Sequence, residues 1–218
     1  MSQVSLLIAT ALIESSSTKA GCCPRSPHGL LLDHAPGSVQ SMIELPVPPT
    51  LSPPSRSVKA SYLLGEQADM LHRESDTSWL AAASRDFDGF VAERAGVRER
   101  WGVPSELFWY TSNEYYIGSL VIRHELSVDE GGGHIGYHVV YPWQRQGHAT
   151  RMLREALGRC SALGIGSALL TVAPENVPSL KVVDRCGGIA DGVNEEGELR
   201  FWIDTSTSVE LVGSGRTR

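Results

Sequence analysis

Residues 134 to 149 read H-I-G-Y-H-V-V-Y-P-W-Q-R-Q-G-H-A, and this stretch decides the fold. Its first half, residues 134 to 141, is rich in aromatic and β-branched residues, which favour a strand. Pro142 ends that strand because proline has no N–H to give to a sheet. From Ala149 to Leu163 apolar residues recur at three- and four-residue spacing, the pattern of an amphipathic helix. The stretch therefore predicts a strand, a glycine-containing turn and a helix.

The turn between this strand and this helix has the features of an anion site. Gly147 lets the main chain approach a ligand closely. The first turn of the helix leaves several N–H groups without acceptors, and the helix dipole adds partial positive charge there. Residues 145 to 160 also hold four arginines and one glutamate, in a chain of formal charge −6. We therefore expect a phosphate cradle built from main-chain N–H groups. The dinucleotide motif G-x-G-x-x-G and the P-loop motif are both absent, so the usual NAD and ATP sites do not explain it.

Regular structure is predicted on both sides of the turn. Upstream, residues 65–103 have helical spacing, and residues 108–111 and 115–124 read as a β-hairpin. Downstream, the apolar run 166–173 is typical of a strand buried on both faces. Asn176 can then cap a short helix that extends to Cys186, and residues 199–203 supply a last strand. The fold class is α/β.

The first 60 residues differ in composition from the rest of the chain, since they hold eight of the twelve prolines and eleven serines. We expect residues 1–57 to form a poorly ordered segment, 58–205 the folded domain and 206–218 a frayed tail. Met42 opens an apolar run and is an alternative start of the natural product. The segment also holds four potential metal ligands, but they lack the Cys-x2-Cys spacing of zinc sites, so we expect no metal. These ligands are Cys22, Cys23, His28 and His34.

Composition excludes several classes of protein. The charge of −6 argues against a nucleic-acid binder, which needs a basic surface. No apolar run approaches the ~20 residues that span a bilayer, so we expect no membrane insertion. Residues 4–13 are apolar, but no lysine or arginine precedes this stretch, as one would in a signal peptide. Four cysteines are too few for a disulfide scaffold. We expect a reduced, cytoplasmic protein.

Two motifs carry a family resemblance. Gln144-Arg145-Gln146-Gly147-His148-Ala149 resembles the Q/R-x-x-G-x-G/A signature of the GCN5-related N-acetyltransferases, the GNAT superfamily. The sequence Asn176-Val177-Pro178-Ser179 resembles the N-x-x-[AS] motif that opens the next helix in that family. The predicted order of strands and helices through residue 203 is also similar to that of the family. V-I-R-H-E-L followed by G-G-G-H-I-G-Y is also similar to the uncharacterised predicted-acetyltransferase branch.

The resemblance implies the GNAT fold, a splayed, mixed and mostly antiparallel sheet flanked by helices. Acetyl-CoA would lie between the strand at 134–140 and the strand at 166–173. Main-chain N–H groups from Gln146 to Thr150 would hold its pyrophosphate, and the two valines before the turn would pair with its pantetheine arm. The residues implied to bind this co-substrate are Val139, Val140, Gln144, Arg145, Gln146, Gly147, His148, Ala149, Thr150, Asn176 and Ser179.

The implied activity is transfer of an acetyl group from acetyl-CoA to an amine by direct attack in a ternary complex. The acceptor would be a small-molecule or peptide amine, and a homodimer is left open. One departure favours an alternative, a non-catalytic acyl-CoA-binding or sensing module. The family often has a tyrosine seven residues after the helix-opening asparagine, where it protonates the departing thiolate, and this chain has Val183 there.

Direct attack also needs a base, because an amine of pKa ~10.4 is almost fully protonated near neutral pH. His134 and His138 are the catalytic candidates, and their even spacing places them on one face of the strand. His134 stands where some family members carry a carboxylate base. For His134 the alternative is a structural histidine at the start of a strand.

Overall fold

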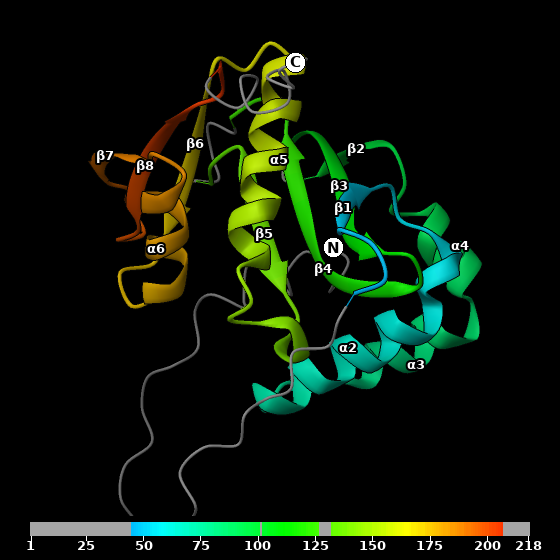
Figure 1. Cartoon of the computed structure of the whole chain (residues 1–218). Coiled ribbons are helices and arrows are strands. Elements are labelled where there is room, and N and C mark those ends of the chain that lie inside the picture. Colours follow the sequence, from blue (N-terminus) through cyan, green and yellow to red (C-terminus); the bar gives the residue numbers. More distant parts are fainter. Residues whose placement is uncertain (1–44, 101, 127–131, 207–218) are drawn as a thin grey trace, which may run out of the picture. The chain divides into compact units, whose positions relative to one another are not determined.

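The predicted strand, turn and helix form the centre of the computed structural model (Figure 1). The structure describes residues 45–100, 102–126 and 132–206. The apolar face of the helix is buried over residues Met152, Leu153, Ala156, Leu157 and Cys160, as its spacing predicts. The central elements are β5 (Ile135–Val139), the 3₁₀ turn η2 (Tyr141–Trp143), α5 (His148–Ala162) and β6 (Ser167–Val172).

The strands form two antiparallel sheets, and β5 and β6 belong to different ones. The larger sheet has the order β1-β3-β4-β5, with β2 also paired to β3. The smaller sheet has the order β6-β8-β7. This arrangement confirms the predicted α/β fold, in which antiparallel sheets separate between β5 and β6. The remaining strands are β1 (Thr50–Ser52), β2 (Val97–Arg100), β3 (Val103–Ser112), β4 (Tyr115–Arg123), β7 (Ile189–Val193) and β8 (Leu199–Asp204).

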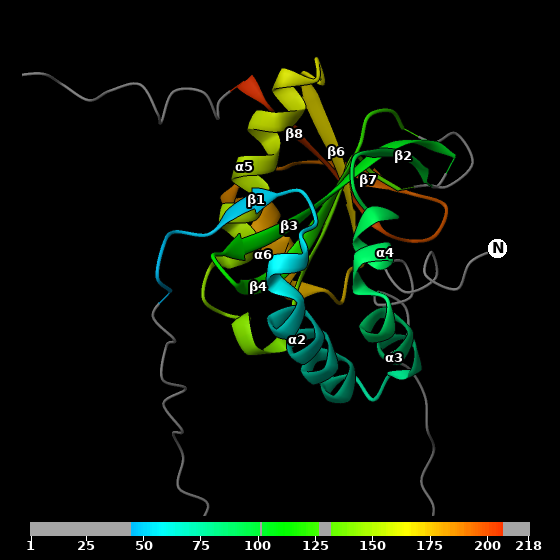
Figure 2. The same ribbon diagram turned by 90° about the vertical axis from the view of Figure 1, so that its right-hand side faces the viewer.

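Helices cover both sides of the larger sheet. Figure 2 shows α5 on one side of β3 and β4 and α4 on the other. On the α4 side, Tyr62 of α2 lies at the centre of an aromatic cluster and stacks on Trp109 of β3 at 4.7 Å between ring centroids. Aromatic rings bury large apolar areas, so this cluster fixes α2 against the sheet. The helices besides α5 are α2 (Lys59–His72), α3 (Ser78–Arg85), α4 (Phe87–Ala92) and α6 (Val177–Arg185), with η1 (Arg56–Val58) before α2.

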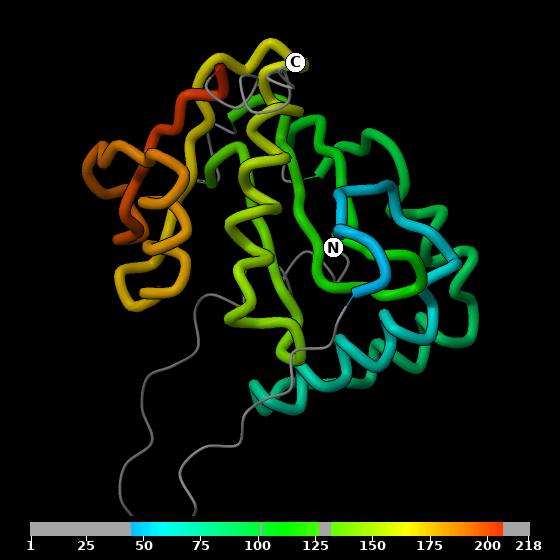
Figure 3. Tube along the Cα trace, viewed as in Figure 1, coloured from blue at the N-terminus to red at the C-terminus, as the bar shows by residue number. Residues whose placement is uncertain are grey.

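The folded domain begins earlier than the expected residue 58. β1 pairs with β3, and the side chain of Leu51 is buried in the core. Glu155 of α5 accepts the N–H of Leu51 at 3.0 Å, and Arg159 donates to its carbonyl at 2.7 Å. Figure 3 shows this segment, in blue, crossing the edge of the larger sheet. The proline-rich composition gave no indication of this short strand, which hydrogen bonds from α5 hold in place.

Several sequence expectations fall outside the described residues, among them the tail from 207 to 218. Cys22, Cys23, His28 and His34 also lie there. Within the three described ranges no group of histidine, cysteine and acidic side chains is arranged as a metal site. No helix in these ranges combines the length and the apolar character that crossing a membrane requires.

Candidate functional site

The two sheets meet through a reciprocal pair of hydrogen bonds between His134 and Leu169. The N–H of His134 donates to the carbonyl of Leu169 at 2.7 Å, and the N–H of Leu169 donates to His134 Nδ1 at 2.9 Å. Gly133 packs so closely here that an added Cβ would overlap the Leu169 carbonyl. No ladder between β5 and β6 continues from this contact in the described residues. The junction is therefore where the two strands begin to separate.

This geometry corrects the prediction that His134 is the catalytic base. Its Nδ1 already accepts a backbone N–H, so the proton of the neutral ring is on Nε2 and no lone pair is left to take another. The ring is buried, and burial together with the charge of Arg123 lowers its pKa. His134 is therefore a structural histidine that joins the two sheets. This is the alternative role that its position at the start of a strand suggested.

Beyond the junction, β5 presents an open backbone edge. Arg123 N–H donates to the His134 carbonyl, and Val140 N–H donates to the Ile117 carbonyl. Hydrogen-bonded positions alternate along an antiparallel pair, so the even-numbered residues of β5 bond to β4. The backbone groups of Tyr137 and Val139 therefore point away from β4. Such an edge can add an extended partner by strand pairing.

The same bonding excludes Val140 from the predicted pantetheine contact. Its N–H is bonded to Ile117, its carbonyl accepts the N–H of Trp143, and its side chain is fully buried. Val139 keeps its N–H on the open edge, while its carbonyl accepts Gln144 Nε2 at 2.9 Å. Of the two valines, only Val139 can pair with a ligand.

The turn before α5 leaves a row of main-chain N–H groups unpaired. From Gln146 to Thr150 no N–H has an acceptor within the described part of the chain. Arg145 and Gly147 both adopt positive φ, at 62° and 76°, and these two bends shape the turn. Helix N-termini with unpaired N–H groups are anion sites. The predicted phosphate cradle therefore has suitable backbone geometry, and the Arg145 side chain next to it is exposed.

Two side chains of this turn, Gln144 and His148, face inward and brace it. Gln144 bonds to the carbonyl of Val139 and approaches Asp69 Oδ1 at 3.5 Å. His148 is buried, and its Nδ1 accepts from Arg151 at 3.1 Å. Burial and the charge of Arg151 lower the pKa of His148 to about 4. Its imidazole is thus a neutral packing group. This corrects the expected contact between the His148 side chain and CoA, and only the main-chain N–H of His148 remains for a ligand.

Asn176 caps α6 as its position predicts. Its Oδ1 accepts the N–H of Ser179 at 3.2 Å, which satisfies one of the unpaired donors of the helix start. Asn176 and Ser179 are both partly exposed. They remain candidates for the ligand contacts that the resemblance implies.

His138, the second predicted base, lies in a charged cluster with two residues of α2. Its Nε2 is 3.2 Å from Asp69 Oδ2, and its Nδ1 is 3.2 Å from Arg73 Nη2. Arginine only donates, so Nδ1 accepts and the Nε2 proton faces the carboxylate. The side chain of His138 is 24% exposed, whereas that of Asp69 is fully buried. His138 is thus the accessible member of a His–Asp pair.

Asp69 is the residue that organises this cluster. Burial alone would raise its pKa, but the hydrogen bond and charge of His138, the charge of Arg73 and the N–H of Tyr141 together lower it. Arg73 Nε lies 2.9 Å from Asp69 Oδ2, and Tyr141 N–H donates to Oδ1 at 2.9 Å. The carboxylate is therefore kept ionised beneath the imidazole.

Glu66, one helical turn before Asp69, is a second buried acid on α2. Tyr116 donates its hydroxyl to Glu66 Oε1 at 2.8 Å, and burial raises the pKa of the carboxyl above its ordinary value. Neither acid is among the site residues predicted from the sequence, although their spacing carries a signal. Their three-residue spacing places them on the same helix face as Tyr62 and Met70, which is buried. Acidic residues on an apolar face are seldom there for packing alone.

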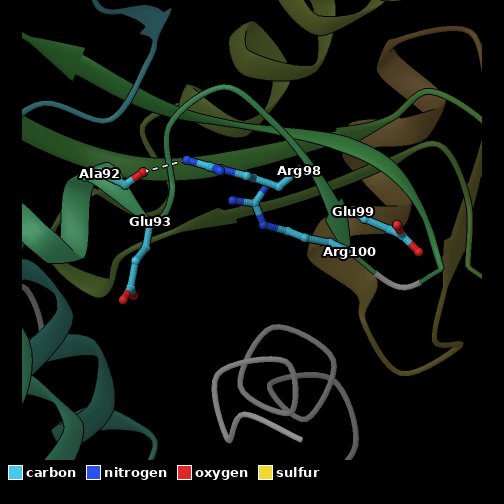
Figure 4. A pocket seen from close by; sticks show the side chains of 5 residues that line it. All are labelled: Ala92, Glu93, Arg98, Glu99 and Arg100. Atoms are coloured by element: carbon cyan, nitrogen blue, oxygen red, sulfur yellow. Dashed lines mark hydrogen bonds between the residues drawn. The ribbon is translucent and has the colours of Figure 1, made fainter.

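A separate surface hollow of about 520 Å³ lies away from these groups, beside α4 and β2. Figure 4 shows the side chain of Arg98 donating to the carbonyl of Ala92, and Arg98 also donates to Ala95. Its guanidinium therefore braces the connection between α4 and β2. None of the predicted site residues lines this hollow.

Comparisons with known proteins agree with this geometry. The family model described as "Acetyltransferase (GNAT) domain" matches residues 58–189. Among solved structures, Mycobacterium smegmatis RimJ in complex with CoA-disulfide has a TM-score of 0.54 and 21% identity over 74% of this chain and 87% of that one. A putative ribosomal-protein-serine acetyltransferase from Vibrio cholerae has a TM-score of 0.51 and 18% identity over 71% and 92%.

A third solved structure is the spermidine N-acetyltransferase from Vibrio cholerae in complex with CoA and spermine. Its TM-score is 0.50, with 18% identity over 74% of this chain and 98% of that one. At these identities the likeness shows the fold, and no curated protein sequence matches the chain significantly. The family model spans more than half of the residues, and so the chain belongs to the GNAT acetyltransferase family.

Proposed function

We propose that this protein is an N-acetyltransferase that moves the acetyl group of acetyl-CoA to an amine in a ternary complex. The observation that carries the proposal is a single continuous arrangement. The unpaired N–H groups from Gln146 to Thr150 follow, after η2, the strand β5 with its open edge at Tyr137 and Val139, and His138 lies on that same strand with Asp69 behind it. The intracellular supply of acetyl-CoA supports action in the cytoplasm.

The residues toward the co-substrate act through main chain. The N–H groups at the start of α5 hold the pyrophosphate, aided by the helix dipole and the exposed Arg145. Val139 pairs its N–H with the pantetheine arm or the thioester oxygen, where a fixed donor stabilises developing negative charge. Asn176 and Ser179 on α6 face the other side of the arm. Acetyl-CoA, when bound, supplies the reactive acyl group.

His138 takes the proton of the attacking amine. In the free protein Arg73 donates to His138 Nδ1, and an incoming ammonium replaces Arg73 as the donor. The proton then passes to Nδ1, and the imidazolium is stabilised by Asp69, whose carboxylate lies 3.2 Å from Nε2. The ionised Asp69 beside His138 favours a cationic acceptor, and a small-molecule or peptide amine is cationic near neutral pH.

Thiol release measures this function directly. The purified full chain is incubated with acetyl-CoA and panels of polyamines, amino acids, aminoglycosides and peptides with free N-termini, and free CoA is quantified. We expect amine-dependent CoA release with at least one class. Tight CoA binding by calorimetry without release for any class would instead support the sensing module, which the lack of a hydroxyl at Val183 favours.

A further inference from the structure

The helix position that usually supplies a hydroxyl to the leaving thiolate cannot do so in this chain. Val183 is fully buried, and its Cγ1 lies 2.3 Å from where a Cβ on Gly188 would be. The valine side chain therefore packs directly against the backbone of Gly188 and carries no hydroxyl. If acetyl transfer takes place here, any donor to the sulfur has to come from another element.

Tyr137 places a hydroxyl on the relevant side of the molecule. It lies on β5 three residues after His134, just past the point where the two sheets separate. A hydrogen-bonding contribution from Ser179 of α6 lowers its pKa and the charge of Cys186, which follows α6, raises it, so the ring extends from β5 toward α6. The side chain therefore lies between the open strand edge and the helix that carries the second family motif.

The hydroxyl of Tyr137 is also unusual in having no hydrogen-bond partner. The oxygen is buried, and within the described residues no group meets the full distance and angle criteria of a hydrogen bond with it, although Ser179 lies close enough to lower its pKa. Leaving a buried polar group unpaired costs free energy, and such groups in native proteins call for an explanation. A ligand atom that arrives between β5 and α6 would provide the missing acceptor.

We propose that the Tyr137 hydroxyl donates a hydrogen bond to the sulfur of the departing CoA thiolate, in place of the tyrosine absent at position 183. This inference rests on the proposed acetyltransferase function. It assigns a catalytic residue to β5 rather than to α6. The same unpaired hydroxyl gives a reason why Val183 is compatible with activity.

The chemistry balances without a further reactant. An ammonium acceptor first passes one proton through His138 to solvent. The neutral amine nitrogen then forms a bond to the acetyl carbon, the C–S bond breaks with its electron pair staying on sulfur, and the second proton of the nitrogen goes to His138. Burial raises the pKa of Tyr137 to about 12. A CoA-like thiol has a pKa of ~8.5, so the phenol keeps its proton and stabilises the thiolate by hydrogen bonding alone. Solvent supplies the proton when CoA leaves.

Tyr137→Phe tests the proposal, because it removes only an unpaired oxygen. We expect kcat to fall about 10- to 100-fold, the range for a hydrogen bond to a charged group, with little change in KM for acetyl-CoA. The melting temperature should not fall, since no protein bond is lost. A second readout is the pKa of the CoA thiol on the protein, followed by the ultraviolet absorbance of the thiolate, which should be higher in the variant than in the wild type.

Tyr115→Phe, which removes a hydroxyl from β4, is the matched control and should match the wild type in all readouts. An unchanged kcat and an unchanged thiol pKa in Tyr137→Phe would overturn the proposal. A raised KM alone would also overturn it and assign Tyr137 to pantetheine binding. Failure of the underlying function looks different, because the wild type itself would then bind CoA and release none from acetyl-CoA.

Discussion

His134 and His138 project from one face of the same stretch of chain, yet their ring nitrogens have different partners. His134 Nδ1 accepts a main-chain N–H in the buried junction of the sheets. His138 meets Arg73 through Nδ1 and Asp69 through Nε2, with about a quarter of its side chain exposed. A side chain can exchange its partner for a substrate only where solvent and ligands reach it. At the scale of residues, the two histidines therefore divide into a structural one and one that can serve as the proposed base.

Substituting the two histidines should separate these roles. His138→Ala is expected to lower kcat by roughly 10²–10³, within the range of general bases, and to leave CoA affinity unchanged. His134→Ala should instead destabilise the fold by about 1–3 kcal/mol, because the Leu169 N–H loses its acceptor. His134→Asn, whose oxygen can replace Nδ1, should recover most of that stability. A larger loss of kcat in folded His134→Asn than in His138→Ala would contradict the assignment.

His148 should make folding sensitive to acid. Its pKa in the folded protein is about 4, while an unfolded histidine has a pKa of ~6.5. Between these values the unfolded state binds the extra proton, so the free energy of unfolding should fall as the pH falls from about 6.5 to 4. Urea denaturation at a series of pH values measures this slope. His148→Gln, which cannot titrate, should have a slope smaller by up to one proton, and equal slopes would refute the prediction.

At the scale of elements, α5 performs two tasks with its two ends. Gly147 begins it at φ 76° and Gly164 follows it at φ 81°, so both termini use left-handed glycines. Only the first end carries unpaired N–H groups beside the open strand. The middle of the helix, through Glu155 and Arg159, fixes β1 to the larger sheet.

The two glycines offer a matched pair of substitutions. Valine at either position should cost stability, since a β-branched residue is an outlier at positive φ, and L-residues lose roughly 1–2 kcal/mol there. Gly147→Val should also abolish CoA binding measured by calorimetry, because its side chain intrudes on the cradle. Gly164→Val should bind CoA normally, since nothing lies within 4 Å of its added Cβ. Similar affinity in the two variants would rule out the cradle at Gly147.

At the scale of the whole molecule, the domain is two sheets joined at one edge and held by helices on both sides. The aromatic cluster around Tyr62 fixes α2 to the larger sheet, and α2 in turn supplies Asp69 to the site. The segment from Leu45 to Ser57 belongs to this domain through Leu51. The site therefore depends on the packing of segments that are distant in the sequence.

Two truncations should define the minimal domain. A chain that begins at Met42 should unfold with the same free energy as the full protein and bind CoA equally well. A chain that begins at Pro54 lacks β1, so it should lose about 2–4 kcal/mol from Leu51 burial and from the unpaired groups of α5. Chemical denaturation of the two proteins provides the comparison. A large loss in the longer chain would show that residues before 42 contribute to the fold.

The parts that sequence predicts well are those governed by local patterns. The periodicity of α5, the apolar run of β6, the hairpin of β3 and β4 and the Asn176 cap all depend on neighbours in the chain. β1, β2 and β7 were missed because they are short and depend on pairing with strands elsewhere. The partners of His134 and His138 were likewise set by packing of distant segments. Sequence spacing could place the two rings on one face, but it could not show which one was already bonded.

The carboxylate of Asp69 also links the occupancy of two ligands. Its Oδ1 accepts the N–H of Tyr141 and lies near Gln144, shortly before the turn that is proposed to hold CoA, and its Oδ2 faces His138, the proposed base. A ligand that orders the groups bonded to one oxygen of Asp69 also reduces the motion of the groups bonded to the other oxygen. The second ligand then loses less conformational entropy on binding, which gives positive cooperativity. By thermodynamic reciprocity, acceptor amine and CoA should each raise the other's affinity by the same factor, and in Asp69→Asn that factor should approach one in paired calorimetric titrations.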